Sequence, residues 1–448
     1  MSQSRTPPPN RSIGKVVVAS LIGTTIEWYD FFLYGSAAAL VFNQVFFPES
    51  EALVGTLLAF TTYAVGFVAR PLGGLVFGHY GDRIGRKRLL VISLLLMGGA
   101  TFAIGLLPTY AAIGVAAPLL LTALRVVQGF ALGGEWGGAV LIVSEHGDGR
   151  NRGFWASWPQ AGVPCGNLLA TAVLAVLAVA MPDPVFLAWG WRVPFLLSGV
   201  LVLVGLWIRL AVAESPVFRE AAERAEATGT PERAPILDVL TRHWREVLVA
   251  MGVRFAENIS YYVLTAFILV YATEHAGLAN STVLNAVLVA SAAHLVTIPL
   301  WGALSDRIGR RPVIALGAAG VAGWSFAFFP LIDAGTFGAV ALAATVGLVL
   351  HGAMYGPQAA FFSELFGTRV RYSGASVGYQ LASIFAGGVA PLVATGLLAS
   401  FGTALPVSVY VTAAGVLTIV AVWASRETRG RDLAEVPAGR LGASGAER

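Results

Sequence analysis

The sequence predicts an all-α membrane protein with twelve transmembrane helices in two parallel six-helix pseudo-repeats. Its 448 residues are 56% hydrophobic and only 12% charged, which is too little charge to cover a soluble surface. Apolar stretches of the ~20 residues that a spanning helix needs recur about twelve times. A basic loop, Gly-x-x-x-Asp-Arg-Ile-Gly-Arg followed by Lys or Arg, occurs between such stretches at residues 78–87 and again at 302–311. A repeat of this kind indicates a duplicated membrane fold, and such folds are most often transporters.

The elements follow in an order that divides the chain into two halves. A polar stretch from Glu214 to Arg245 separates the halves. We therefore expect an N-terminal tail (1–15), a helical bundle (16–212), a central loop (213–245), a second bundle (246–425) and a C-terminal tail (426–448). The predicted helices begin near Val16, Leu53, Leu89, Ile113, Phe154 and Leu187, and then near Val247, Val283, Val313, Phe337, Gly374 and Leu405.

A second sequence similarity between the halves, besides the basic loop, indicates their relative direction. Ser144-Glu145 precedes a Gly-rich helix that carries Gln160, and Ser363-Glu364 precedes one that carries Gln380. In both halves the Ser-Glu segment follows the basic loop after nearly the same number of residues, so we expect the halves to run in the same direction.

The positive charges lie on one side of the predicted bundle. The Lys and Arg residues of the predicted loops lie on one side, with the exception of Arg192 at the outer end of the sixth helix, and the charged residues of the opposite loops are acidic. This bias places both termini and the central loop in the cytoplasm, in a multi-pass protein of a bacterial plasma (inner) membrane. It also explains the net charge of +4 without a nucleic-acid partner, so the expected partner surface is the lipid bilayer.

The sequence lacks the patterns of an enzyme. The single cysteine, Cys165, rules out an internal disulfide and a cysteine metal cluster. The run GGEWGG at residues 133–138 has no preceding strand and no following Lys-Ser or Lys-Thr, so close helix packing explains it better than phosphate binding. We expect no catalysis, no metal and no cofactor.

Ionisable groups within the predicted spans are candidates for function, because charge at bilayer depth is costly. At ~1.5 Å per residue, Asp30 and Arg125 lie near the midplane of the membrane. Arg254 and Glu135 lie at similar depths in its inner, cytoplasmic half. We therefore predict two ion pairs, Asp30 with Arg125 and Arg254 with Glu135. Four acids face three arginines, Arg70 included, and the surplus carboxylate is expected to take up a proton. Packing roles for Glu135 and Glu257 stay open, and such roles are favoured for His294 and His351. The proton-coupling candidates are Asp30, Glu27, Glu135 and Glu257.

Polar and aromatic side chains on the same helices predict a polar cavity in an apolar bundle. A guanidinium suits bidentate binding of a carboxylate, so the arginines are the first candidates for contact with an acid. Individual Trp and Tyr residues could instead be interfacial or packing groups. The substrate-binding candidates are Arg125, Arg254, Tyr34, Gln128, Trp158, Gln160, Asn258, Tyr262, Tyr355, Gln358, Tyr379 and Gln380.

Two six-helix halves with this duplicated loop resemble the major facilitator superfamily. Four further segments resemble its metabolite:proton symporter family: IGTTIEWYDF at 22–31, RPLGG at 70–74, Gln128-Gly129 with GGEWGG at 133–138, and WGWRVPF at 189–195. The first half and the seventh helix are most similar to the shikimate-type permeases, whereas the tenth helix departs from them.

The resemblance implies roles for both basic loops. Asp82, supported by Arg83 and Arg86, would make a gating contact with the eleventh helix, and Asp306, Arg307 and Arg310 would do the same in the second half. The alternative is that these charges only set the topology. Arg125 matches the arginine that superfamily members place beside the proton site.

These observations predict a monomeric, proton-coupled symporter that imports a small organic acid by alternating access. The acid could be shikimate-like, a dicarboxylate or a monocarboxylate. An osmolyte (proline or betaine) symporter and an exchanger or efflux carrier of the same fold are the alternatives. A membrane sensor is disfavoured, because the chain lacks a sizeable soluble domain.

Overall fold

The computed structural model describes residues 13–84, 86–133, 140, 143–144, 149–211, 239, 241–366 and 371–431, and the regular elements of this part are helices. Glu135 lies outside the described residues, as do most of the predicted central loop and most of both predicted tails. The side chains of Asp82, Arg83 and Arg86 also lie outside the described part.

The first half contains long helices joined by short helical turns. The turns are η1 (Ala38–Phe42), α2 (Asn43–Val45), α5 (Tyr110–Ile113), η2 (Gly149–Asn151), α9 (Asp183–Val185) and η3 (Phe186–Gly190). The long helices are α1 (Ile13–Ala37), α3 (Ala52–Ile84), α4 (Arg86–Leu106), α6 (Ala116–Leu132), α8 (Arg152–Ala180) and α10 (Arg192–Ala211).

The second half repeats this pattern, with two of its spans interrupted by π-helical turns. Its first span is α13 (Trp244–Tyr262) continued by η4 (Val263–Phe267), α14 (Ile268–Val270) and η5 (Tyr271–His275). Its fifth span is α18 (Arg371–Ala382) continued by η6 (Ser383–Gly388) and α19 (Ala390–Phe401). The other spans are α15 (Asn280–Ile308), α16 (Arg310–Asp333), α17 (Phe337–Leu365) and α20 (Leu405–Ala424).

The lengths and apolar character of these helices suit a bilayer. Within the described residues, eight helices are long and apolar enough to cross a membrane, and the bent pair of Asp183–Gly190 with Arg192–Trp207 makes a ninth. Two shorter apolar helices, Val91–Leu106 and Ala116–Leu132, and the acid-bearing helix α1 complete the set. This arrangement agrees with the predicted twelve-helix fold.

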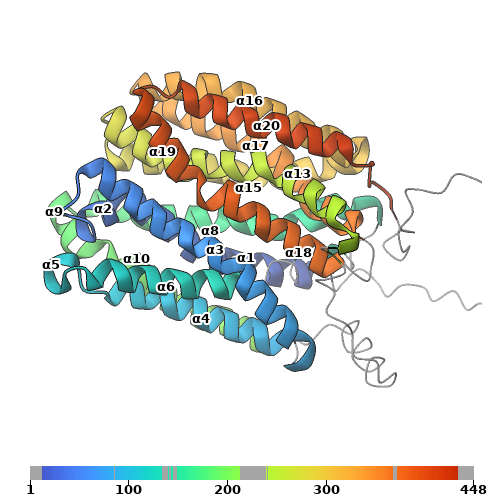
Figure 1. The fold of residues 1–448 in the computed structure, drawn as a ribbon, viewed down its shortest axis with the longest axis horizontal. Helices are drawn as coiled ribbons and strands as arrows, with labels where there is room; N and C mark the ends of the chain where they lie inside the picture. The colour runs from blue at the N-terminus through green and yellow to red at the C-terminus, as the bar shows by residue number, and fades with distance from the viewer. Residues whose placement is uncertain are drawn as a thin grey trace, which may run out of the picture.

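The helices lie roughly side by side along one direction, with the two halves in contact (Figure 1). Helices α4, α6 and α10 lie toward one edge of the view, and α16, α17 and α20 lie toward the other (Figure 1). The halves meet where α8 packs against α15 and α17, and where α3 packs against α18, η6 and α19. The centre of the bundle is therefore built from both halves.

Small residues let the central helices approach closely. A Cβ on Gly73 of α3 would overlap the backbone carbonyl of Phe130, and one on Gly133 would overlap the carbonyl of Arg70. Gly387 and Gly388 of η6 lie so near Phe67 that a Cβ on either would come within 2.9 Å of its ring. At Gly133, the predicted role of small residues in close helix packing is confirmed.

Candidate functional site

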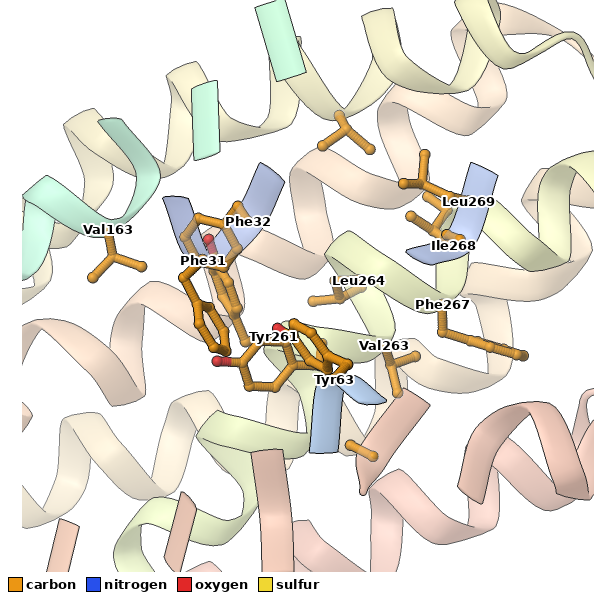
Figure 2. Close-up of a cluster of buried hydrophobic side chains, with 14 of the residues drawn as sticks. Phe31, Phe32, Tyr63, Val163, Tyr261, Val263, Leu264, Phe267, Ile268 and Leu269 are labelled. Carbon is orange, nitrogen blue, oxygen red and sulfur yellow. The ribbon is translucent and has the colours of Figure 1, made fainter. Parts of the chain in front are cut away.

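Aromatic rings from three helices meet where the halves join. Phe31 of α1 packs on Tyr63 and Phe67 of α3, with ring centroids 5.0 Å apart in both pairs. Tyr262 of α13 closes the group from the second half, 5.6 Å from Phe67. Figure 2 shows Phe31 and Phe32 beside Tyr63 and Tyr261 in the buried centre. These rings form the apolar wall against which the central charges lie.

Arg125 projects from α6 into this wall and is only 1% exposed. Its guanidinium carbon lies 4.5 Å from the centroid of Phe31, 4.4 Å from that of Tyr34 and 4.8 Å from that of Tyr63. Its Nη1 donates to Oε1 of Gln128 at 3.1 Å, while its Nε and Nη2 have no hydrogen-bond partner. The guanidinium is therefore fixed by cation–π contacts and one amide, and the side that carries Nε and Nη2 stays free.

The neighbours of Arg125 keep it in this position. Gln128 donates to the hydroxyl of Thr101 at 2.6 Å, and the hydroxyls of Tyr34 and Thr62 lie 2.6 Å apart. A Cβ on Gly66 would come within 2.6 Å of the Nε of Arg125, so the absence of a side chain there makes room for the guanidinium. Tyr34 and Gln128 are both among the predicted binding residues, and the structure brings them together with Arg125.

Asp30 lies near Arg125 but does not pair with it. The carboxyl is 2% exposed and sits beside Thr101. Its Oδ1 has no hydrogen-bond partner, and no ion pair within 4.0 Å involves Asp30 among the described residues. The predicted Asp30–Arg125 ion pair is thus absent from this conformation, although the two charges are close enough to interact at longer range. Glu27 is buried one turn earlier on α1.

Arg254 of α13 is satisfied on several sides. Its Nη1 donates to Glu257 at 2.9 Å and to Gln358 at 3.1 Å, and its Nε donates to Ser383 at 3.2 Å. Its guanidinium carbon lies 3.3 Å from the ring centroid of Tyr379. The depth argument predicted Glu135 as the partner of Arg254; Glu135 lies outside the described residues, and within them Arg254 pairs with Glu257, three residues along the same helix.

The two histidines extend this network, which sequence reasoning missed. His351 Nε2 lies 3.3 Å from Glu257 Oε1, and His351 Nδ1 lies 3.0 Å from His294 Nε2. The ring of Tyr261 lies beside both imidazoles in tilted contacts, with centroids 5.0 Å from His351 and 5.9 Å from His294. Since these groups come from α13, α15 and α17, no spacing along the chain could have revealed their contact.

A small cavity lies beside this network. Its wall is formed mainly by α13, with contributions from α1, α8 and α17. The lining residues are Trp28, Val163, Arg254, Glu257, Asn258, Tyr261, Tyr262, His351 and Tyr355. Five predicted site residues, Arg254, Glu257, Asn258, Tyr262 and Tyr355, therefore share one cavity. Asn258 also donates to Ser383 at 3.4 Å.

Three predicted binding residues have other surroundings. Trp158 is half-buried and packs on Ile13 and Val17 at one end of α1, away from this cavity. Gln160 of α8 donates to the carbonyl of Tyr355 at 3.5 Å, and Gln380 of α18 donates to the carbonyl of Gly133 at 3.2 Å. The two glutamines thus make matching contacts from each half to the other.

The second basic loop also joins the halves. Asp306 at the end of α15 accepts hydrogen bonds from the backbone N–H of Gly153 at 2.8 Å and of Phe154 at 2.9 Å, at the start of α8. Arg310 donates to Asp306 at 2.7 Å and to Glu364 at 3.2 Å, and Glu364 also accepts from Arg152 at 2.9 Å. Arg307, by contrast, is exposed.

Arg70 of α3 is the second arginine against the ring wall. It is 1% exposed, and its guanidinium carbon lies 4.1 Å from the centroid of Phe67 and 4.4 Å from that of Phe31. Its Nε and Nη2 have no partner, and no carboxylate of the described residues forms an ion pair with it. Arg70 was recognised from the sequence as a buried charge but was not assigned to the site.

Comparison with known proteins places these features in a family. Residues 20–387 match the Major Facilitator Superfamily. The inner membrane metabolite transport protein YhjE of Escherichia coli K12 is 41% identical over 95% of this chain and 97% of its own length. The shikimate transporter of the same organism is 42% identical over 86% of this chain and 88% of its own length.

More distant relatives give the range of the similarity. The proline/betaine transporter of Escherichia coli K12 is 32% identical over 94% of this chain and 84% of its own length. Among solved structures, a D-xylose-proton symporter superposes with a TM-score of 0.73 at 20% identity, covering 94% of this chain and 99% of that one. At that identity, the superposition supports the fold alone.

Proposed function

Because this chain belongs to the major facilitator superfamily of transporters, and is not an enzyme, we propose that it is a proton-coupled symporter that imports a small organic acid. A small-molecule substrate is what its metabolite-transporting relatives have in common. The coupling, the acid and the direction of transport are the parts that this proposal adds.

One observation carries the proposal: a buried arginine and a buried carboxyl lie close together, and each has an unused hydrogen-bonding edge. Arg125 leaves Nε and Nη2 without partners, and Asp30 leaves Oδ1 without one. A guanidinium edge of this kind binds a carboxylate through two parallel hydrogen bonds. The free oxygen of Asp30 is where a proton would be held.

The coupling follows from the charge balance at the site. When Asp30 is ionised, its negative charge offsets the positive charge of Arg125 and would repel an entering carboxylate. When Asp30 takes up a proton, the positive charge of Arg125 becomes available to the substrate. Protonation and substrate binding therefore favour one another, which is the thermodynamic requirement for symport.

We further propose that the carrier alternates between states closed at either end. The contacts of Asp306 with α8, and of Arg310 with Asp306 and Glu364, would close the end that bears the basic loops, and Asp82, Arg83 and Arg86 would act likewise in the first half. Arg307, which is exposed, would act through the general positive potential of that end. In this proposal the basic end and both termini face the cytoplasm of a bacterial inner membrane, and the protein works as a monomer of two bundles.

The test is uptake of labelled organic acids into proteoliposomes under an imposed pH gradient, acid outside. We expect accumulation in the wild type, loss of accumulation but retained exchange in Asp30→Asn, and loss of both in Arg125→Gln. Arg192→Gln is the matched control, because Arg192 caps backbone carbonyls at Ala188 and Leu107 away from the cavity. Accumulation that survives in Asp30→Asn at full strength would contradict the proposal.

An osmolyte symporter is the second candidate, and the aromatic wall is the observation that favours it. Quaternary ammonium ligands bind in aromatic cages. In this chain, however, Phe31, Tyr63 and Phe67 already stack on Arg70 or Arg125. Uptake of betaine or proline that is indifferent to Arg125→Gln would favour this alternative, and uptake that needs internal counter-substrate would identify an exchanger.

A further inference from the structure

Two buried arginines of the first half share one aromatic ring. The guanidinium carbon of Arg70 lies 4.4 Å from the ring centroid of Phe31, and that of Arg125 lies 4.5 Å from the same centroid. Both side chains are 1% exposed. The two positive groups therefore flank a single phenyl ring in the interior of the bundle.

Each of these arginines leaves the same edge unused. In both, the Nε and Nη2 atoms are buried and have no hydrogen-bond partner. These two N–H groups point the same way and form the edge of a guanidinium that grips a carboxylate bidentately. Arg254, the third central arginine, differs, because its Nε and Nη1 donate to Ser383, Glu257 and Gln358.

Within the described part of the chain, neither arginine has an acidic partner at ion-pair distance. Among the described residues, no carboxylate lies within ion-pair distance of Arg70 or Arg125, and cation–π contacts supply only part of what hydration would give. A buried guanidinium left uncompensated is costly, and the cost is removed by an anion that reaches it. Two such guanidinium groups beside one ring match an anion that carries a negative charge at each end.

We propose that Arg70 and Arg125 together form a dicarboxylate site, with one carboxylate of the substrate on each guanidinium and its short carbon chain against Phe31. This inference rests on the proposed import of an organic acid and names the class of acid. Arg125 binds the carboxylate common to all organic acids, and Arg70 sets the requirement for the second. Arg254 takes no direct part in holding the substrate in this conformation.

The discrimination expected from such a site is large. An analogue that lacks one carboxylate leaves one guanidinium edge buried and unpaired, and sites built around a hydrogen-bonding group reject analogues without it strongly. Losing one charge-assisted bidentate contact corresponds to a fall of roughly ten- to a hundredfold in affinity. Succinate and butyrate are suitable probes, because they have the same four-carbon skeleton and differ by one carboxylate.

The experiment is calorimetric titration of the full-length protein in lipid nanodiscs with succinate, butyrate and shikimate. We expect the wild type to bind succinate at least about tenfold more tightly than either monocarboxylate. Arg70→Gln should remove this advantage and leave butyrate within about twofold of its wild-type affinity, while Arg125→Gln should weaken all three acids. Arg192→Gln is the control for loss of a positive charge elsewhere and should change none of them.

The outcomes separate this inference from the proposed function. Equal binding of succinate and butyrate by the wild type, or equal weakening of both in Arg70→Gln, overturns the dicarboxylate site but leaves organic-acid symport standing. Failure of every acid to bind overturns both. Should Arg70→Gln not yield folded protein, the wild-type ratio of the two affinities still decides. Arg70→Lys, which keeps the charge but loses the planar edge, should then retain only part of the preference for succinate.

Discussion

Replacing Glu257 by glutamine removes the only carboxylate that pairs with Arg254 among the described residues. The two groups are 3% and 1% exposed, and their charged atoms lie 2.9 Å apart. The attraction between them is strong because little water screens it, so removing one partner leaves a guanidinium buried without compensation. Such a change costs roughly 3–5 kcal/mol. His351 also loses its carboxylate acceptor, which adds to the loss.

The assay is a double-mutant cycle followed by the apparent melting temperature in detergent. With each bundle unfolding like a domain of about 200 residues, 1 kcal/mol corresponds to about 2–4 °C, so Glu257→Gln should lower the melting temperature by roughly 6–20 °C. Arg254→Gln should cost a similar amount, and the double variant should lose far less than both together, because no unpaired charge remains.

The control is Glu246→Gln on the same helix, whose side chain is 40% exposed and lies 4.0 Å from His243. It should change stability by less than about 0.5 kcal/mol. Additive losses in the Glu257 and Arg254 variants would refute the reasoning, since they would mean that the two charges contribute independently.

Three further outcomes are expected. Gly73→Ala should lower the melting temperature because its Cβ would overlap a carbonyl of α6, whereas Gly99→Ala on α4, where nothing lies within 4 Å, should be neutral or slightly stabilising. Asp306→Asn should weaken the contact with the start of α8, so a cysteine reporter introduced at the basic end should react faster with a soluble maleimide; an unchanged rate would contradict this. Burial raises the pKa of Glu427, but backbone N–H groups of residues 310, 311, 428 and 429 hold it below its usual range. Its contribution is therefore present at neutral pH and lost as the pH falls through the lowered pKa, so Glu427→Gln should reduce stability at pH 7, by less than about 1 kcal/mol for so exposed a group, and progressively less as the pH is lowered through that pKa.

Much of the fold could be predicted because the bilayer restricts the possibilities. Spans of apolar residues must be helices, and the repeat of the basic loop orders them into halves. The sequence could not show where π-helical turns interrupt the spans, as at Val263–Phe267 and Ser383–Gly388. Such a turn depends on the packing of a helix against its neighbours, so no pattern in the local sequence predicts it.

The sequence indicated which buried charged residues lie in the candidate site, but not which of them contact one another. Counting residues placed Asp30 and Arg125 at similar depths, and the structure brings them close but not into contact. Depth along a helix axis says nothing about which way a side chain faces, so it did not reveal that Arg254 pairs with Glu257. The roles of His294 and His351 were missed for the same reason, because contacts among three helices leave no mark on the spacing within any one of them.

The buried charges are paired in the second half and largely unpaired in the first, and this asymmetry fits the proposed coupling. In the second half, Arg254 and Glu257 neutralise one another and are held by Gln358 and His351, so that half is balanced without a ligand. In the first half, Arg70 and Arg125 keep open edges, and Asp30 keeps an open oxygen. A carboxylate that binds Arg125 neutralises its charge only if Asp30 is not ionised, because an ionised Asp30 would leave a surplus negative charge in an apolar interior. In the proposed symport, the linkage of acid and proton would therefore follow from the cost of burying charge rather than from a dedicated relay.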